Sequence, residues 1–177
     1  MKATKVIVLS LLTATLLAMA CGGGSTTAEE HTQKGILYWA EGRLDDAIAQ
    51  YDKAIELDPS FVDAYFARGV AFSGQGQWDL VIADYTKAIE LDPSFAEAYG
   101  SRGNAYLELG QFQRAIEDFD ELLRLNPEQP LGYAFRALAY TGLGNDQEAE
   151  HDIDKAVELG LDADLLNPLI EELKAQR

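Results

Sequence analysis

The chain has 177 residues, of which 47% are hydrophobic and 25% are charged, so it can form one domain with packed interior surfaces. Its 30 acidic and 14 basic residues give a formal net charge of -16, which argues against duplex nucleic acid or an anionic lipid surface as a partner. The single cysteine, Cys21, excludes an intramolecular disulfide.

The N-terminal residues have the pattern of a secretory signal. Lys2 and Lys5 precede an uncharged run over residues 6–20, and Ala20 stands just before Cys21. A membrane-spanning helix needs about 20 apolar residues, so a run this short favours cleavage over a permanent transmembrane anchor.

Residues 17–21, Leu-Ala-Met-Ala-Cys, resemble the lipobox of bacterial lipoproteins, in which the cysteine is acylated and becomes the new N-terminus. The match departs at one place, because Ala18 stands three residues before the cysteine where leucine is usual. The resemblance implies a signal peptide over 1–20, then a lipidated Cys21 and a flexible linker over 21–27.

The same resemblance implies a location in the bacterial cell envelope, with the protein anchored to a membrane by its acyl chains. Gly22 follows the cysteine, and since it is not aspartate it is compatible with the periplasmic face of the outer membrane in a Gram-negative host. The folded domain would then lie beside a membrane surface.

The rest of the chain repeats with a fixed period. Residues 51–61 (YDKAIELDPSF) and 85–95 (YTKAIELDPSF) differ at one position and are offset by 34 residues. A period in the range of about 20 to 50 residues is typical of solenoids built from stacked units. Four copies follow from this offset: 28–61, 62–95, 96–129 and 130–163.

Small, aromatic and turn-forming residues recur at fixed positions, counted from the start of each copy. Position 8 holds Gly35, Gly69, Gly103 and Ala137, and position 11 holds Tyr38, Phe72, Tyr106 and Tyr140. Position 15 is Gly42, Gly76, Gly110 and Gly144, and position 32 is Pro59, Pro93, Pro127 and, in the last copy, Leu161. Over residues 28–163 the chain resembles the tetratricopeptide repeat family. The resemblance implies an all-α, right-handed solenoid of four helix pairs.

The same positions predict where the helices end. Glycine at position 15 ends the first helix of each pair in the left-handed conformation, and proline at position 32 stops the second, which runs from about position 17 to position 30. Ser60 and Ser94 stand where a side-chain oxygen can cap the following helix.

A solenoid needs its last apolar face covered, and residues 164–177 are predicted to form a capping helix. Asn167 is expected to cap a helix that begins at Pro168. The apolar face toward the last repeat would consist of Leu165, Leu166, Leu169, Ile170 and Leu173.

Position 7 is arginine in the last three copies, although the family usually has an apolar residue there, and position 23 is then aspartate. The three pairs are Arg68 with Asp84, Arg102 with Asp118, and Arg136 with Asp152. The first copy has Lys34 and Gln50 instead, so the charge and its partner change together. We predict a structural ion pair in each of the last three copies, and the alternative is a basic ladder for an acidic ligand.

The chain lacks the residues that catalysis needs. Its only imidazoles are His31, at a packing position, and His151, among acids, and Cys21 is the expected lipid site. No nucleophile and base set recurs, and no spacing indicates a metal site or a cofactor. The sequence therefore predicts no enzyme.

The candidate binding surface follows from helical geometry. At about 100° per residue, positions 2, 5, 6, 9, 12 and 13 of the first helix cluster opposite the packed positions, and in the family this face lines the concave side. None of these 24 positions is Lys or Arg. The predicted partner-binding residues are Ile36, Trp39, Asp63, Phe66, Val70, Glu97, Asn104, Leu107, Glu108, Leu131, Phe135 and Leu138. Packing against neighbouring helices remains an alternative role for each aromatic residue.

Chaperone-binding members of the family grip a peptide's terminal carboxylate with lysines, arginine and asparagines on this face. The matching positions here are Thr32, Ile36, Ala67, Glu97 and Ser101, so that function is not carried over.

The sequence thus favours a membrane-anchored scaffold with an apolar, acid-rimmed groove for a protein or peptide segment that is apolar and neutral to basic. The alternative is a structural spacer or a self-associating module, whose groove is filled by another copy or by its own tail.

Overall fold

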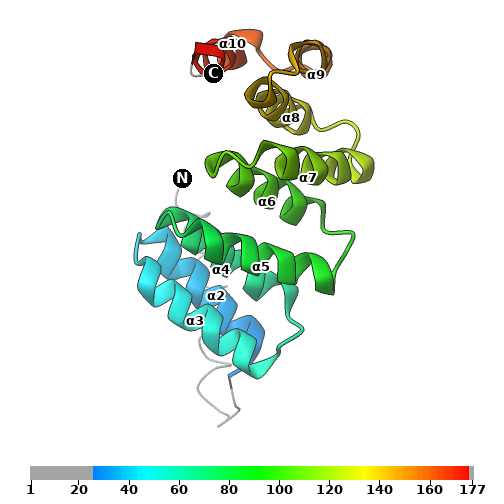
Figure 1. The fold of residues 1–177 in the computed structure, drawn as a ribbon. Helices are drawn as coiled ribbons and strands as arrows, with labels where there is room; N and C mark the ends of the chain where they lie inside the picture. Colours follow the sequence, from blue (N-terminus) through cyan, green and yellow to red (C-terminus); the bar gives the residue numbers. More distant parts are fainter. Residues whose placement is uncertain (1–25, 176–177) are drawn as a thin grey trace, which may run out of the picture.

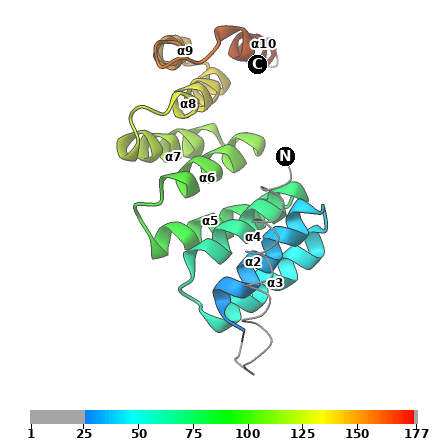
Figure 2. The same ribbon diagram turned by 180° about the vertical axis from the view of Figure 1, so that it is seen from behind.

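A computed structural model describes residues 26–175 of the chain, which form nine α-helices and no strand (Figure 1). The helices are α2 (Ala28–Ala40), α3 (Leu44–Leu57), α4 (Val62–Gly74), α5 (Trp78–Leu91), α6 (Ala96–Glu108), α7 (Phe112–Leu125), α8 (Pro130–Leu143), α9 (Asp146–Glu158) and α10 (Ala163–Ala175). The first eight form four antiparallel pairs that stack in chain order, as the view from behind also shows (Figure 2). The predicted all-α solenoid is confirmed. The predicted signal peptide and the acylation of Cys21 lie outside the described residues.

The turn glycines end the first helix of each pair as the sequence predicts. Gly42, Gly76, Gly110 and Gly144 have φ values of 74°, 69°, 67° and 81°, in the left-handed region that other residues resist. Each lets the chain reverse within a few residues, so the second helix returns along the first.

Within each of the first three pairs, the glycine at position 8 allows the two helices to approach closely. A Cβ atom added to Gly103 would lie 2.8 Å from Cε1 of Phe119, and the same conflict exists between Gly69 and Tyr85. Phe119 is fully buried, and burying a side chain of this size contributes about 1.5–3 kcal/mol. The two helices of each of these pairs are therefore packed through an aromatic ring of the second helix that contacts the backbone of the first helix at its glycine.

The described core is divided into clusters that follow the order of the repeats. One cluster joins Val81 and Tyr85 of α5 to Ala105 of α6, and another joins Phe119 of α7 to Ala139 of α8. Each cluster crosses from one repeat into the next, as expected where a single pair cannot bury its own apolar face.

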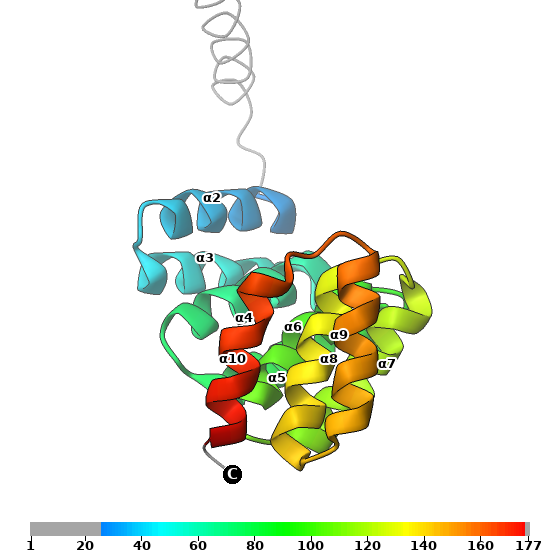
Figure 3. The same cartoon turned by 90° about the horizontal axis from the view of Figure 1, so that it is seen from above.

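The C-terminal helix covers the last repeat. Leu166 and Ile170 are 4% and 3% exposed and belong to a cluster with residues of α8 and α9. Figure 3 shows the three helices side by side at this end of the solenoid. The helix begins earlier than predicted. Pro168 therefore lies inside it, and Asn167 is not its cap. Its start at Ala163 also overlaps the last residue assigned to the fourth repeat.

The predicted serine caps are wrong. Ser60 donates its hydroxyl to Oδ1 of Asp58 at 2.6 Å, and α4 has no side-chain hydrogen bond at its N-cap. Ser94 donates to Asp92 in the same way at 2.6 Å. The N-caps are instead Phe61 and Phe95, one residue after each serine, and neither side chain has an oxygen that could accept from the helix amides.

The three predicted Arg–Asp pairs are formed, each between the two helices of one repeat. Nη2 of Arg68 lies 2.7 Å from Asp84 and Nη2 of Arg102 lies 2.7 Å from Asp118. In the last repeat, Nε of Arg136 lies 2.7 Å from Asp152. The side chains of all three aspartates are buried.

Each of these arginines also reaches back to the preceding repeat, which the sequence did not predict. Nη1 of Arg102 donates to Oγ1 of Thr86 on α5 at 2.9 Å, and Arg136 pairs with Asp120 on α7. Burial raises the pKa of the Asp118 carboxyl, while the Arg102 guanidinium acts in the opposite direction. The arginine therefore offsets part of the cost of burying the carboxylate, and it links three helices.

Candidate partner-binding groove

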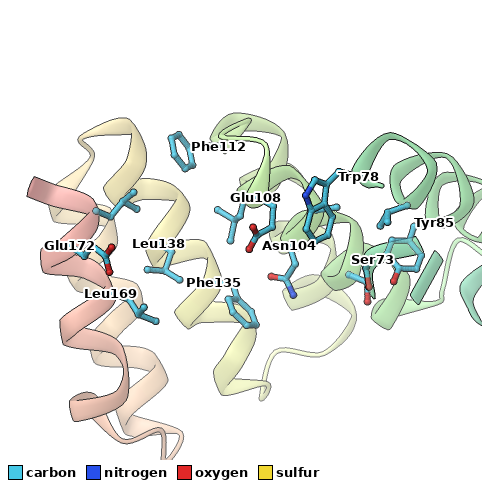
Figure 4. Close-up of a pocket in the computed structure, with 15 residues that line it drawn as sticks. Ser73, Trp78, Tyr85, Asn104, Glu108, Phe112, Phe135, Leu138, Leu169 and Glu172 are labelled. Carbon is cyan, nitrogen blue, oxygen red and sulfur yellow. The ribbon is translucent and has the colours of Figure 1, made fainter. Parts of the chain in front are cut away.

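A large hollow of about 690 Å³ lies on one side of the solenoid, between α5 and α10 (Figure 4). Its lining residues come from six helices: Ser73, Trp78, Val81, Tyr85, Ser101, Asn104, Ala105, Leu107, Glu108, Phe112, Phe135, Leu138, Leu169, Glu172 and Leu173. Most of them are apolar, so the hollow suits apolar side chains of a partner.

A smaller hollow of about 240 Å³ adjoins the first between α6 and α8. It is lined by Phe66, Glu97, Gly100, Ser101, Asn104, Leu122, Gln129, Leu131, Gly132 and Phe135. The two hollows share Ser101, Asn104 and Phe135, so they form one continuous surface. We refer to the larger and smaller hollows together as the groove.

Eight of the predicted partner-binding residues line the groove. Asn104, Leu107, Glu108, Phe135 and Leu138 line the larger hollow, and Phe66, Glu97 and Leu131 line the smaller one. These predictions are consistent with the geometry, and binding by these residues stays a prediction.

The other four predicted residues line neither hollow. Ile36 and Trp39 of the first repeat are 40% and 45% exposed, and Asp63 is exposed. Val70 packs against the cluster around Tyr85. The hollow forms where α10 faces α5 and α6, and the lining contains no residue of α2.

The sequence left open whether the aromatic residues pack or contact a ligand, and two of them are placed for both. Phe66 lies between the rings of Tyr85 and Phe95, with centroid distances of 5.3 and 4.8 Å. Phe135 stacks on Phe119 at 6.0 Å. Both rings are half-buried and line the smaller hollow. Their positions are therefore fixed by packing before any ligand arrives.

Sequence reasoning missed the contribution of the second helices and of α10. Trp78 and Phe112 occupy the first position of α5 and α7, and Tyr85 lies further along α5. Leu169 was expected to pack on the last repeat, yet it is 51% exposed and lines the larger hollow with Leu173. The available signal for this contribution was the large apolar residue that recurs at position 17 of the first three copies.

The charged side chains that line the groove are all acidic. Glu97, Glu108 and Glu172 are exposed, and no lysine or arginine lines either hollow. Oδ1 of Asn104 and Oε1 of Gln129 are buried and have no hydrogen-bond partner in the described part of the chain. A buried acceptor without a donor costs about 1–3 kcal/mol, so both atoms favour a ligand that brings donors.

The phenol of Tyr85 adds a neutral polar group to the wall. Burial raises its pKa to about 12, with a smaller opposing effect from a hydrogen bond with Ser101. The hydroxyl therefore stays protonated at neutral pH and adds no charge to the groove.

Two further properties concern the whole of residues 26–175. None of the helices there has the length and apolar character needed to cross a bilayer. The same residues contain no group of three or more His, Cys, Asp or Glu side chains that could hold a metal ion.

Family profiles match most of the repeat region. Profiles described as TPR repeat match residues 35–76 and 74–110, and profiles described as tetratricopeptide repeat match residues 96–129 and 132–159. The chain belongs to the tetratricopeptide repeat family. Its architecture is that of a scaffold for protein–protein interaction.

Several solved structures share the fold. One crystal structure of MamA protein is 30% identical with a TM-score of 0.71, covering 75% of this chain and 72% of that one. Another crystal structure of MamA is 27% identical with a TM-score of 0.72, and the match covers 93% of this chain and 87% of that one. The first TPR domain of Spaghetti (RPAP3), bound to the HSP90 peptide SRMEEVD, is 26% identical with a TM-score of 0.66, covering 68% and 96%. No curated protein sequence matches the chain.

Proposed function

We propose that this protein is a scaffold of the bacterial cell envelope, anchored to a membrane through a lipid on Cys21, and that its groove binds an apolar, neutral-to-basic segment of a partner protein. The groove carries the proposal, because it combines a large apolar hollow with acidic residues and lacks basic side chains. Apolar anchors supply affinity in such a site, and the acids select the partner's charge.

The charge of the groove separates this protein from the RPAP3 domain, whose bound peptide SRMEEVD ends in acidic residues. Glu97 lies on the groove here, and the lysines and arginine that a carboxylate grip requires are absent from its lining. An acidic C-terminal peptide is therefore not the expected ligand.

The groove is tested by substituting Leu138, which lines the larger hollow, with lysine. A cation there repels a basic partner and fills the apolar space, so Leu138→Lys should abolish capture of a partner from envelope membranes. Leu80→Lys is the matched control, because Leu80 is 45% exposed and lies outside the groove. Because Leu138 also packs on the last core cluster, both variants need an unchanged melting temperature. Capture by a folded Leu138→Lys variant at the level of the control contradicts a groove function.

The membrane anchor is tested at Cys21. The Cys21→Ser variant should leave the membrane fraction and should not incorporate labelled palmitate. The parent should stay in the membrane fraction and should incorporate the label. The substitution leaves every described helix untouched, so loss of folding cannot explain release. A variant that sediments with membranes as completely as the parent contradicts the anchor.

One observation favours the alternative of self-association. Ile36 and Trp39 on α2 are 40% and 45% exposed and lie three residues apart on one face, so the first helix leaves an apolar surface uncovered at that end of the solenoid. Light scattering over a range of protein concentrations would detect self-association, and an increase in mass that Trp39→Glu removes would support the self-associating module over the scaffold.

A further inference from the structure

We infer that the smaller hollow is a binding site for an arginine side chain of the partner. The inference rests on the proposed function and narrows it, since it assigns one residue type to one part of the groove.

Besides the hydroxyl of Ser101, the residues that line the smaller hollow carry three side-chain oxygen acceptors and no cation. They are the carboxylate of Glu97 on α6, Oδ1 of Asn104 on the same helix, and Oε1 of Gln129 before α8. The last two are buried and accept no hydrogen bond within the described residues, so a ligand whose N–H groups reach them would satisfy their hydrogen-bonding capacity. Glu97 supplies the negative charge that selects a cationic donor.

Two of the residues that form the walls of the hollow are aromatic. Phe66 and Phe135 line it, and each ring is held by a second ring, Tyr85 for the first and Phe119 for the second. A cation near the face of an aromatic ring gains about 0.5–2 kcal/mol, and a planar guanidinium can also stack on the ring. The walls thus reinforce the preference for a cation that the oxygen atoms establish.

The number and arrangement of donors favour arginine over lysine. A guanidinium offers five N–H groups in one plane, which can serve three separate oxygen atoms, whereas an ammonium offers three and holds its water more tightly. The arginine would lie next to the larger hollow, because the two hollows share Asn104 and Phe135. The preferred segment therefore carries an arginine beside an apolar residue.

The start of α8 also borders the smaller hollow, through Leu131 and Gly132. A helix N-terminus favours anions, but its free amides point along the helix axis. An anion in the hollow would face the Glu97 carboxylate and the two unpaired oxygen atoms without a basic side chain to hold it.

The test uses the full chain in detergent and three blocked dipeptides as probes: acetyl-Phe-Arg-amide, acetyl-Phe-norleucine-amide and acetyl-Phe-Glu-amide. NMR follows the side-chain NH2 signals of Asn104 and Gln129 during titration. The arginine probe should shift both signals and bind about tenfold more tightly than the norleucine probe, since hydrogen bonds to a charged group are the stronger kind. The glutamate probe should bind the weakest.

Two variants assign the effect to one carboxylate. Glu97→Gln should lower the affinity for the arginine probe about tenfold and leave the norleucine probe unchanged. Glu108→Gln is the matched control, because Glu108 lies on the same helix but lines only the larger hollow, and it should change the arginine affinity less than about twofold.

The outcomes separate this inference from the proposed function. Equal affinity for the arginine and norleucine probes overturns the arginine site and leaves the groove as an apolar binding surface. Tightest binding of the glutamate probe also overturns the arginine site, because it would show that the groove prefers an anion. Binding of no probe to the smaller hollow also overturns it, while the proposed function is decided separately by capture with the Leu138→Lys variant.

Discussion

The first repeat and the three that follow share one backbone plan but differ in how they are joined. In repeats two to four, an arginine binds an aspartate of its own repeat and a side chain of the preceding one, as Arg68 does with Asp84 and Asp52. In the first repeat, Nδ1 of His31 lies 2.9 Å from Oε1 of Gln50, and no charged pair joins the two helices.

The difference follows from position in the stack. An arginine at position 7 has two sets of partners only when the second helix of a preceding repeat packs beside it. Among the described residues, no helix precedes the first repeat. Lys34 therefore needs no buried partner, and it is exposed. The ion pair therefore joins neighbouring repeats as well as the two helices of one repeat.

The largest expected effect comes from breaking one of these joints. Arg102→Ala leaves the buried carboxylate of Asp118 without its cation, and this should lower the free energy of unfolding by about 3 kcal/mol at neutral pH. Lys34→Ala, at the same position of the first repeat, should change it by less than about 0.5 kcal/mol. Urea unfolding monitored by circular dichroism measures both.

Acid should partly restore the Arg102→Ala variant. Burial raises the pKa of Asp118 in the folded state, so the folded chain takes up a proton at a higher pH than the unfolded chain does. The cost of the uncompensated charge is present above that pKa and is relieved as the pH falls through it. A deficit that stays constant between about pH 7 and pH 4 would show that lost packing, and not charge, is responsible.

The next effect concerns binding and compares two tryptophans. Trp78 lines the larger hollow, whereas Trp39 in the first repeat lines neither hollow. Trp78→Ala should weaken binding of a captured partner by about 2 kcal/mol, which is roughly 30-fold, and Trp39→Ala should leave it unchanged. Titration by calorimetry gives both affinities. Equal losses from the two variants would extend the binding surface to the first repeat.

A smaller effect tests the glycine at position 8 that the first three repeats share. Gly103→Ala places a methyl group 2.8 Å from the Phe119 ring, so it should cost about 1–2 kcal/mol after the gain in helix propensity, and Gly35→Ala should cost a similar amount. Gly100→Ala on the same helix meets only a terminal methyl of Leu122 at 3.1 Å and should be tolerated. Thermal unfolding ranks the three, and a harmless Gly35→Ala would mean that the first repeat packs more loosely.

The sequence predicted the parts of the fold that local chemistry determines. Gly110 ends α6 because a left-handed residue is needed there, and Arg102 pairs with Asp118 because their positions change together from copy to copy. The serine caps were wrong because α4 begins one residue later than a Ser60 cap requires, so Phe61 occupies the N-cap position.

The groove was predicted only in part. Asn104 and Phe135 on the predicted face of the first helices do line the hollow, but the walls supplied by Trp78 and Leu169 depend on how the repeats curve and where α10 docks. Curvature is the sum of small rotations between repeats, so no single position encodes it. The unpaired oxygen of Gln129 likewise follows from packing between α6 and α8.

The smallest expected effect lies in the loops that join the repeats. Oδ1 of Asp58 accepts hydrogen bonds from Oγ and N of Ser60 at 2.6 and 2.9 Å, and these bonds lower its pKa below 3.8. A carboxylate whose pKa is lower in the folded state stabilises the fold above its unfolded pKa, and this contribution disappears as the pH falls through the folded value. Asp58→Asn should therefore be slightly less stable than the parent at neutral pH and equal to it in strong acid.

The third repeat supplies the control for this last prediction, because Asn126 occupies the position of Asp58 and Glu128 occupies that of Ser60. Asn126→Asp should gain no stability at neutral pH, since the loop has no hydroxyl to donate to the new carboxylate and Glu128 repels it. Urea unfolding of both variants and the parent across the acid range decides the matter. A deficit of Asp58→Asn that does not change with pH would assign the effect to the shape of the loop, and a gain from Asn126→Asp would show that the backbone amide alone holds the carboxylate.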